Sequence, residues 1–171
     1  MPLSIRNQQR SVHIDTPSIR RRVHRLMTYL DCDQQELSIV FANNRFMQTL
    51  NRTYRQKDYP TNVLAFPQSP GAHDEPGPQL LGDIVVALPT AAQEARALNQ
   101  AIEDRLFYLI THGLLHLLGF DHEGSAAKRH RMEAREVEIL KQFKQDIPAP
   151  LMPGNRSRPT QPFNVQACND E

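Results

Sequence analysis

The amino-acid sequence predicts an α+β fold in which a small mixed β-sheet packs against helices. Short runs rich in Val, Ile and Leu alternate with longer segments whose apolar residues recur every three or four positions. One of these longer segments, residues 102–118, is apolar on almost every side, which is typical of a helix buried inside a domain. The 171 residues are enough for one domain with a hydrophobic core.

A strand over residues 3–8 and a helix over residues 16–30 are expected first. Thr16 is the predicted N-cap of this helix, with Pro17 at its first position, where a proline loses no hydrogen bond. The apolar face of the helix consists of Ile19, Val23, Leu26, Met27 and Leu30. Its outer side carries Arg20, Arg21, Arg22 and Arg25, which we interpret as a solvated face.

The second strand is expected over residues 36–41, where alternation places Leu37, Ile39 and Phe41 on one face. Asn43 is then a suitable N-cap for a second helix. The predicted apolar stripe of that helix consists of Phe46, Met47, Leu50 and Tyr54.

Two further strands are expected over residues 62–66 and 82–88. Between them, residues 67–79 contain four prolines and two glycines, and this composition predicts a mobile loop. Pro89 is expected to open a third helix, and the apolar segment 102–118 is the fourth.

The last helix is expected to begin after Ser125, which is a suitable N-cap. Its inward residues are predicted to be Met132, Val137, Leu140 and Phe143. Beyond Gln145 the apolar periodicity ends and prolines become frequent. We therefore expect one domain over residues 1–145 and a disordered, proline-rich tail over residues 146–171.

Charge and cysteine content limit the classes of partner and compartment. The net charge of +1 gives no general attraction to nucleic acid, so any contact with an anionic polymer must come from a local patch. Cys32 and Cys168 are far apart and belong to no C-x-x-C pair, so we expect no disulfide framework. The start lacks the apolar core of a signal peptide, and no apolar run approaches the roughly 18 residues of a membrane span. We expect a cytoplasmic protein.

Three histidines lie within the stretch HGLLHLLGFDH, residues 112–122. His112 and His116 are four positions apart, so on a helix they point from the same face. Gly119 is expected to end the helix, because glycine readily takes the left-handed conformation found there, and the turn would bring His122 back toward the pair. Three imidazoles in this arrangement can occupy three corners of a zinc tetrahedron and leave the fourth open.

A pair of histidines at helical spacing is more often a hydrogen-bonded pair in a core. Burying polar nitrogens without partners costs roughly a few kcal/mol each, however, and this segment contains few other polar groups, so one shared metal is the simpler solution. Zinc is favoured, although copper or nickel can bind the same ligands. No cysteine is near enough in sequence to close a structural site, and this favours catalysis. Asp121 and Glu123 remain open as a fourth ligand, and Asp121 could equally orient an imidazole.

The spacing H-x-x-x-H-x-x-G-x-x-H is that of the metzincin metalloproteases, in which Glu follows the first His as the general base. In this sequence Gly113 holds that position. Glycine cannot accept a proton, so a zincin-like scaffold is predicted without its peptidase base.

Taken with NRTYRQKDYPTNVLAFP and GDIVVAL, the histidine motif resembles the YbeY family over about residues 3–144. The resemblance implies a zincin-like α+β domain with one Zn2+ per chain, acting as a single-strand-specific, metal-dependent endoribonuclease. It implies a role in 16S rRNA 3′-end maturation and in ribosome quality control. By position, the resemblance makes His112, His116 and His122 the metal ligands. Arg55 corresponds to an arginine of functional importance.

The same resemblance implies single-stranded rRNA and the small ribosomal subunit as partners, with no membrane and no DNA. Arg55 could hold a phosphate through its planar guanidinium. The family typically has T-D-V-L-S-F-P, from which this chain departs at Asn62 and Ala65. The arginines at 20–25 and the KRHR segment at 128–131 could follow an RNA backbone, but solvated faces are the preferred interpretation.

Two alternative functions remain open at this stage. The first is a ribosome-assembly factor that carries a structural zinc and binds RNA without cutting it. The second, less favoured, is a zinc peptidase.

Overall fold

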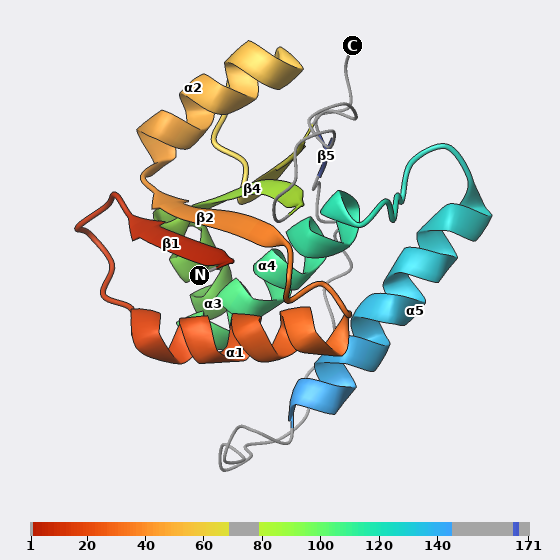
Figure 1. Ribbon diagram of the computed structural model, residues 1–171. Helices are drawn as coiled ribbons and strands as arrows, with labels where there is room; N and C mark the ends of the chain where they lie inside the picture. The colour runs from red at the N-terminus through yellow and green to blue at the C-terminus, as the bar shows by residue number, and fades with distance from the viewer. Residues whose placement is uncertain (1, 69–78, 145–165, 168–171) are drawn as a thin grey trace. The chain divides into compact units, whose positions relative to one another are not determined.

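The computed structural model describes residues 2–68, 79–144 and 166–167. It divides into two compact units, one of Met1–Phe120 with Val165–Glu171 and the other of Asp121–Asn164. The elements in chain order are β1 (Leu3–Asn7), α1 (Thr16–Tyr29), β2 (Glu36–Ala42), α2 (Asn44–Arg55), β3 (Val63–Pro67), β4 (Leu80–Ala87), α3 (Leu88–Ala97), α4 (Ile102–Leu117), α5 (Ala126–Phe143) and β5 (Gln166–Ala167) (Figure 1).

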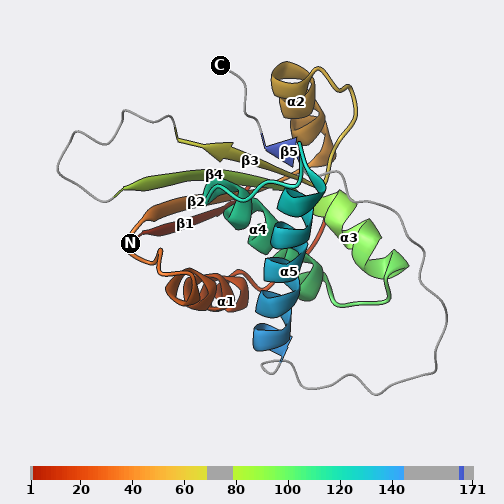
Figure 2. The same cartoon turned by 90° about the vertical axis from the view of Figure 1, so that its right-hand side faces the viewer.

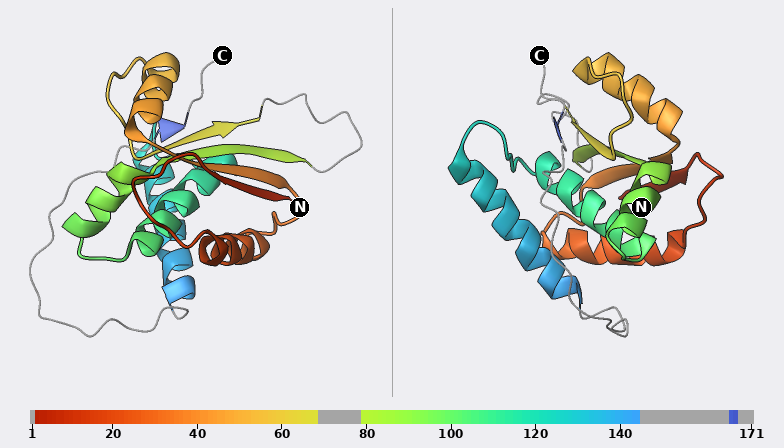
Figure 3. Two further views of the ribbon diagram at one scale, coloured as in Figure 1. Left: turned by 90° about the vertical axis from the view of Figure 1, so that its left-hand side faces the viewer. Right: turned by 180° about the vertical axis from the view of Figure 1, so that it is seen from behind.

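The first unit contains a mixed sheet, which in the described residues has the strand order β1-β2-β4-β3-β5. β1, β2 and β4 are parallel to one another, whereas β3 is antiparallel to β4. β5 is parallel to β3. α2 lies on one face of this sheet, and α1 and α4 lie on the other (Figure 2 and Figure 3). The predicted α+β fold with a small mixed sheet is therefore confirmed.

β2 is buried on both faces. Leu37, Ile39 and Phe41 are almost fully buried, as their alternation predicts. The opposite face of the strand is also covered, because Val40 and Ala42 pack in one cluster with Met47 of α2. The buried residues of this cluster are Val40, Ala42, Met47, Leu64, Val85 and Ala87. The sheet is thus a central layer with apolar packing on each side.

Side-chain caps fix where the helices begin. The amide nitrogen of Phe46 donates to the Asn43 side chain at 2.8 Å, and that of Lys128 donates to Ser125 at 3.2 Å, so both predicted caps are confirmed. The prediction for Thr16 is wrong by one residue: Asp15 is the N-cap and accepts from the Ser18 amide at 3.0 Å. A carboxylate accepts this bond more strongly than a hydroxyl, and Thr16 becomes the first helical residue.

The buried stripes of two helices differ from those predicted. In α2, Phe46 and Tyr54 are 43% and 50% exposed, and the fully buried positions are Met47 and Asn51. In α5, Val137 is 48% exposed. The buried residues of α5 are Met132, Glu136, Ile139 and Phe143, whose spacings of four, three and four follow the helical period more closely.

Some predictions fall on residues that the structure leaves out. Most of the expected loop, residues 69–78, and most of the expected tail, residues 146–165 and 168–171, lie outside the described residues, as does Gln145. Within the described tail, Gln166 and Ala167 pair with Leu64 and Ala65 of β3. None of the helices in the described ranges is long and apolar enough to cross a membrane.

Candidate metal centre

The histidine helix α4 is buried along most of its length, as its sequence predicts. It packs directly on β4 at Gly113. A Cβ atom placed on this glycine would lie 3.2 to 3.3 Å from three side-chain carbons of Ile84. That distance is shorter than an ordinary van der Waals contact, so the glycine allows the helix and the sheet to approach closely.

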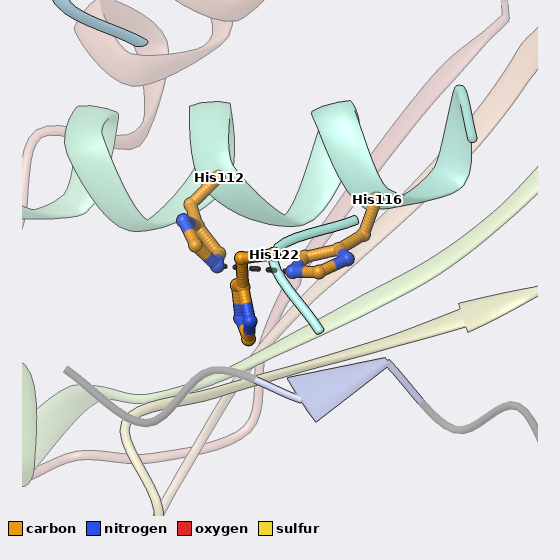
Figure 4. A group of neighbouring side chains, drawn as sticks. All are labelled: His112, His116 and His122. Atoms are coloured by element: carbon orange, nitrogen blue, oxygen red, sulfur yellow. Dashed lines mark hydrogen bonds between the residues drawn. The ribbon is translucent and has the colours of Figure 1, made fainter. Parts of the chain in front are cut away.

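His112 and His116 project from the same face of α4 (Figure 4). Both are buried, with only 5% and 7% of their surface exposed. Their Nε2 atoms lie 3.0 Å apart, and their ring centroids are separated by 4.8 Å at an interplanar angle of 65°. Two ring nitrogens from successive turns therefore converge on one point, as the four-residue spacing predicts.

The helix ends in a turn that depends on Gly119. This residue has φ +92°, and its amide donates to the His116 carbonyl at 3.0 Å, while the amide of Phe120 donates to the Leu115 carbonyl at 2.9 Å. These two bonds define a Schellman motif, which requires a left-handed residue and so favours glycine. The prediction that Gly119 ends the helix is confirmed.

His122 follows two residues after this turn and is half-buried. The candidate ligand atoms of His112, His116 and His122 all lie within 4.8 Å of one another (Figure 4). In a zinc tetrahedron with bonds of about 2.0–2.1 Å, neighbouring nitrogens are separated by about 3.3 Å. The separation of 3.0 Å between the first two nitrogens is close to this value. The three imidazoles can therefore hold a metal ion.

The group is made of histidines only. In the part of the chain that the structure describes, neither Asp121 nor Glu123 belongs to this group. The Asp121 carboxylate instead accepts a hydrogen bond of 2.8 Å from the Glu123 amide in its own loop. Cys32 is a free, buried thiol. Burial, and then the nearby carboxylates of Asp33 and Asp31, raise the pKa of this thiol to about 11, so it is a poor source of the thiolate that metals prefer.

Arg55 lies on a different element from the histidines. It is the last residue of α2 and is half-buried, and Gln56 caps the helix in the left-handed region at φ 54°. The neighbouring Tyr54 packs edge-on against Phe66 of β3, with ring centroids 5.2 Å apart. β3 in turn packs against α4, so the end of α2 is joined to the strand that adjoins the histidine helix.

The sequence did not predict a buried ionic network that joins Arg105 of α4 to Glu94 of α3 and to Asn62. The Arg105 side chain, 4% exposed, donates through Nε to Glu94 at 2.9 Å and forms an ion pair with it at 2.8 Å. The Asn62 amide donates to the other oxygen of the same carboxylate at 3.1 Å. Arg105 also lies 4.9 Å from the Tyr108 ring centroid, one helical turn before His112. The one signal in the sequence was Arg105 itself, the single arginine of this largely apolar helix.

The two residues that depart from the family pattern are both buried. Asn62 holds Glu94 and also accepts the Val63 amide through its side-chain oxygen at 2.8 Å. Ala65 pairs with Ile84 across β3 and β4, so it shares the face of the sheet that contacts Gly113.

Comparisons with known proteins agree on one family. Residues 4–144 match the family model described as "Endoribonuclease YbeY". A relative of that name from Syntrophus aciditrophicus is 41% identical over 141 residues, which cover 82% of this chain and 88% of the relative. Another from Geobacter metallireducens is 39% identical over 141 residues, covering 82% of this chain and 94% of the relative.

A solved structure supports the fold independently. The solution structure of TM1509 from Thermotoga maritima is similar with a TM-score of 0.54 and 22% sequence identity. The similarity covers 90% of this chain and 99% of that one.

Proposed function

Because the chain belongs to the endoribonuclease YbeY family, we propose that it is a single-strand-specific, zinc-dependent endoribonuclease. The observation that carries the proposal is the convergence of three imidazoles, two of them buried on one helix, inside the segment that matches the family. Neutral imidazoles suit zinc better than magnesium or calcium, which prefer oxygen ligands.

We assign His112, His116 and His122 as the metal ligands. The first two are fixed by the buried helix α4, and the third is positioned by the turn at Gly119. A zinc ion bound there would supply Lewis acidity and a hydroxide equivalent near neutral pH, which phosphodiester hydrolysis needs. The histidines serve only to hold the ion, and the substrate must be oriented by other residues.

Arg55 is the residue that we propose for phosphate binding. Its planar guanidinium can donate two parallel hydrogen bonds to a phosphate, an arrangement that a lysine cannot reproduce. Its half-buried position at the end of α2 limits its mobility and leaves part of the side chain accessible. A charge contact that strengthens in the transition state would raise the cleavage rate rather than the affinity for RNA.

The proposed substrate is the 3′ end of 16S rRNA. We propose that the enzyme matures it in the cytoplasm, in contact with the small ribosomal subunit, and that it has a further role in ribosome quality control. The names of the relatives specify endoribonucleases, and the resemblance of the histidine, arginine and strand segments to the family supports the narrower substrate.

The test is cleavage of a single-stranded RNA by purified variants whose zinc content is measured in each preparation. His116→Ala should lose most of its metal and its activity, and chelation of the wild type followed by zinc addition should remove and restore cleavage. Metal-loaded wild type that binds the RNA without cutting it would contradict the proposal and favour an assembly factor with a structural zinc.

Arg55 is tested against a neighbour in the same helical turn. Arg55→Ala should retain zinc and lose about a hundredfold in rate, or roughly 3 kcal/mol of transition-state stabilisation, and Arg55→Lys should recover little. Arg52→Ala is the matched control, because it removes the same charge from an exposed side chain of the same helix. The ion pair that it breaks, between Arg52 Nη1 and Asp58 Oδ1 at 3.9 Å, is exposed as well. Equal rates for Arg55→Ala and Arg52→Ala would remove Arg55 from the active site.

A further inference from the structure

A groove of about 430 Å³ lies between the start of β1 and the outer side of α1. Its lining residues are Pro2, Leu3, Arg20, Arg21, His24 and Arg25. All of them belong to the first unit, and none is among the histidine ligands or close to Arg55 in sequence. The groove is therefore a feature separate from the candidate metal centre.

Positive charge is concentrated on this helix. α1 contains four arginines and one histidine among its fourteen residues and no acidic residue at all. The whole chain has a net charge of only +1, so the excess on α1 is balanced elsewhere. Three of the arginines line the groove, together with His24. A local field of this kind attracts an anionic polymer even though the protein as a whole does not.

Two arginines of α1, Arg22 and Arg20, differ in what they contact. Arg22 serves the fold, because it forms an ion pair with Asp104 at 3.1 Å and its guanidinium lies 4.3 Å from the Phe107 ring centroid on α4. Arg20 instead turns toward the groove and donates to the Leu3 carbonyl at 2.7 Å. This bond holds one guanidinium in place at the wall of the groove, so less conformational entropy is lost when it binds a ligand.

The spacing of the basic residues suits a strand of phosphates. Arg20 and Arg21 lie one helical turn before His24 and Arg25, so the two pairs are separated by about 6 Å along the axis. Pro2, which precedes β1, adds apolar surface beside them, against which a ribose or an unpaired base can pack, whereas Leu3 is buried. Guanidinium groups bind phosphate bidentately, and their planes stack on bases.

We propose that this groove binds the backbone of single-stranded RNA away from the cleaved bond and extends the contact of the enzyme with its substrate. The solvated face expected from the sequence would then be a binding surface. The inference rests on the proposed function for the identity of the anionic polymer, and it adds a second place at which that polymer is held.

The experiment measures binding of a fluorescent single-stranded RNA to the full chain over a series of salt concentrations, with RNA integrity checked by gel. Each phosphate contact on a single strand contributes about 0.7 to the slope of log K against log salt. The double variant Arg21→Gln/Arg25→Gln should therefore lower that slope by about 1.4. The matched control, Arg129→Gln/Arg131→Gln, removes two exposed charges from α5 and should leave the slope unchanged.

Equal effects from the two double variants would overturn the proposal, because net charge alone would then explain the binding. No effect from either would overturn it as well, because the groove would then make no contact with the RNA. Loss of binding to anionic lipid vesicles with RNA binding unchanged would also overturn it and assign the groove to a membrane surface. Thermal melting of each variant establishes that it is folded.

Cleavage kinetics separate this inference from the proposed function. If the groove acts as proposed, the Arg21→Gln/Arg25→Gln variant raises KM and keeps kcat. A wild type that binds RNA with the expected salt dependence but never cleaves it would refute the nuclease and leave the groove intact. A wild type that cleaves RNA, with a double variant of unchanged slope and KM, would refute the groove alone.

Discussion

Replacing Gly113 by alanine tests whether close packing explains why a glycine follows the first histidine. The added methyl group would lie 3.2 to 3.3 Å from three carbons of Ile84. Either the helix or the isoleucine must move by a few tenths of an ångström to accept it. Because Ile84 and its cross-strand partner Ala65 are both fully buried, that movement disturbs the core.

Two opposing terms set the magnitude. Alanine in a helix interior is favoured over glycine by about 0.8–1 kcal/mol. Overpacking a well-filled core costs typically 1–3 kcal/mol. The sum predicts that Gly113→Ala destabilises the protein by about 0–2 kcal/mol. At a solvent-exposed position of a helix, the same substitution would stabilise a protein.

A double-mutant cycle isolates the contact. Ile84→Ala alone should cost about 2–5 kcal/mol by leaving a cavity. In that background Gly113→Ala should stabilise, since the obstructing carbons are gone, so the coupling energy between the two positions should be about 1–3 kcal/mol. The free energies come from urea unfolding with a common slope. If Gly113→Ala stabilises the wild type and the Ile84→Ala variant equally, the packing argument is refuted.

Four further predictions concern groups away from the histidines. Glu94→Gln should lower the free energy of unfolding by about 2–3 kcal/mol. This is somewhat less than the loss expected on breaking a fully buried ion pair, because the Glu94 side chain is 23% exposed. An unchanged urea midpoint would show that Arg105 does not need the Glu94 charge. Native Cys32 should react with iodoacetamide near pH 8 about a hundredfold more slowly than an unfolded cysteine, because its pKa is raised to about 11; peptide mass spectrometry that finds equal rates would contradict this. Since the raised pKa disfavours the thiolate in the folded state, its contribution to stability is complete below about pH 9 and is lost as the pH rises toward 11. Truncation after Gln145 should change the melting temperature by about 2 °C at most, because the family match ends at residue 144 and the part of the tail that the structure describes is two residues paired with β3. A fall of several degrees would show that the tail contributes to the domain.

Local signals in the sequence predict local structure well in this protein. The caps Asn43 and Ser125 follow from residue type alone, because their side chains satisfy amides within the same turn. The termination at Gly119 follows for the same reason. The error at Thr16 arises where two good capping residues are adjacent, and the stronger acceptor, the Asp15 carboxylate, takes the cap position.

Long-range contacts escape this kind of prediction. Periodicity predicts β3 and β4 as strands. It does not predict that β3 pairs with the edge of β4 opposite to β2, or that β3 and β4 are antiparallel. The same holds for the network around Glu94, where Asn62 lies 32 positions away in sequence. A pattern of residue types cannot reveal such a pairing until the chain is folded, because each member alone resembles an ordinary surface residue.

The histidine pair was predictable because both of its members lie on one helix, but the reason for Gly113 was not. From chemistry alone, the glycine is simply a missing base. From the structure, it is the point at which α4 contacts Ile84. A carboxylate at this position would enter the interface between helix and sheet, where desolvation of the charge is costly. The close packing that excludes a glutamate also fixes α4 against the sheet, and a fixed helix keeps the two buried nitrogens 3.0 Å apart. The absence of a peptidase base and the fixed placement of the two histidines therefore have one physical cause.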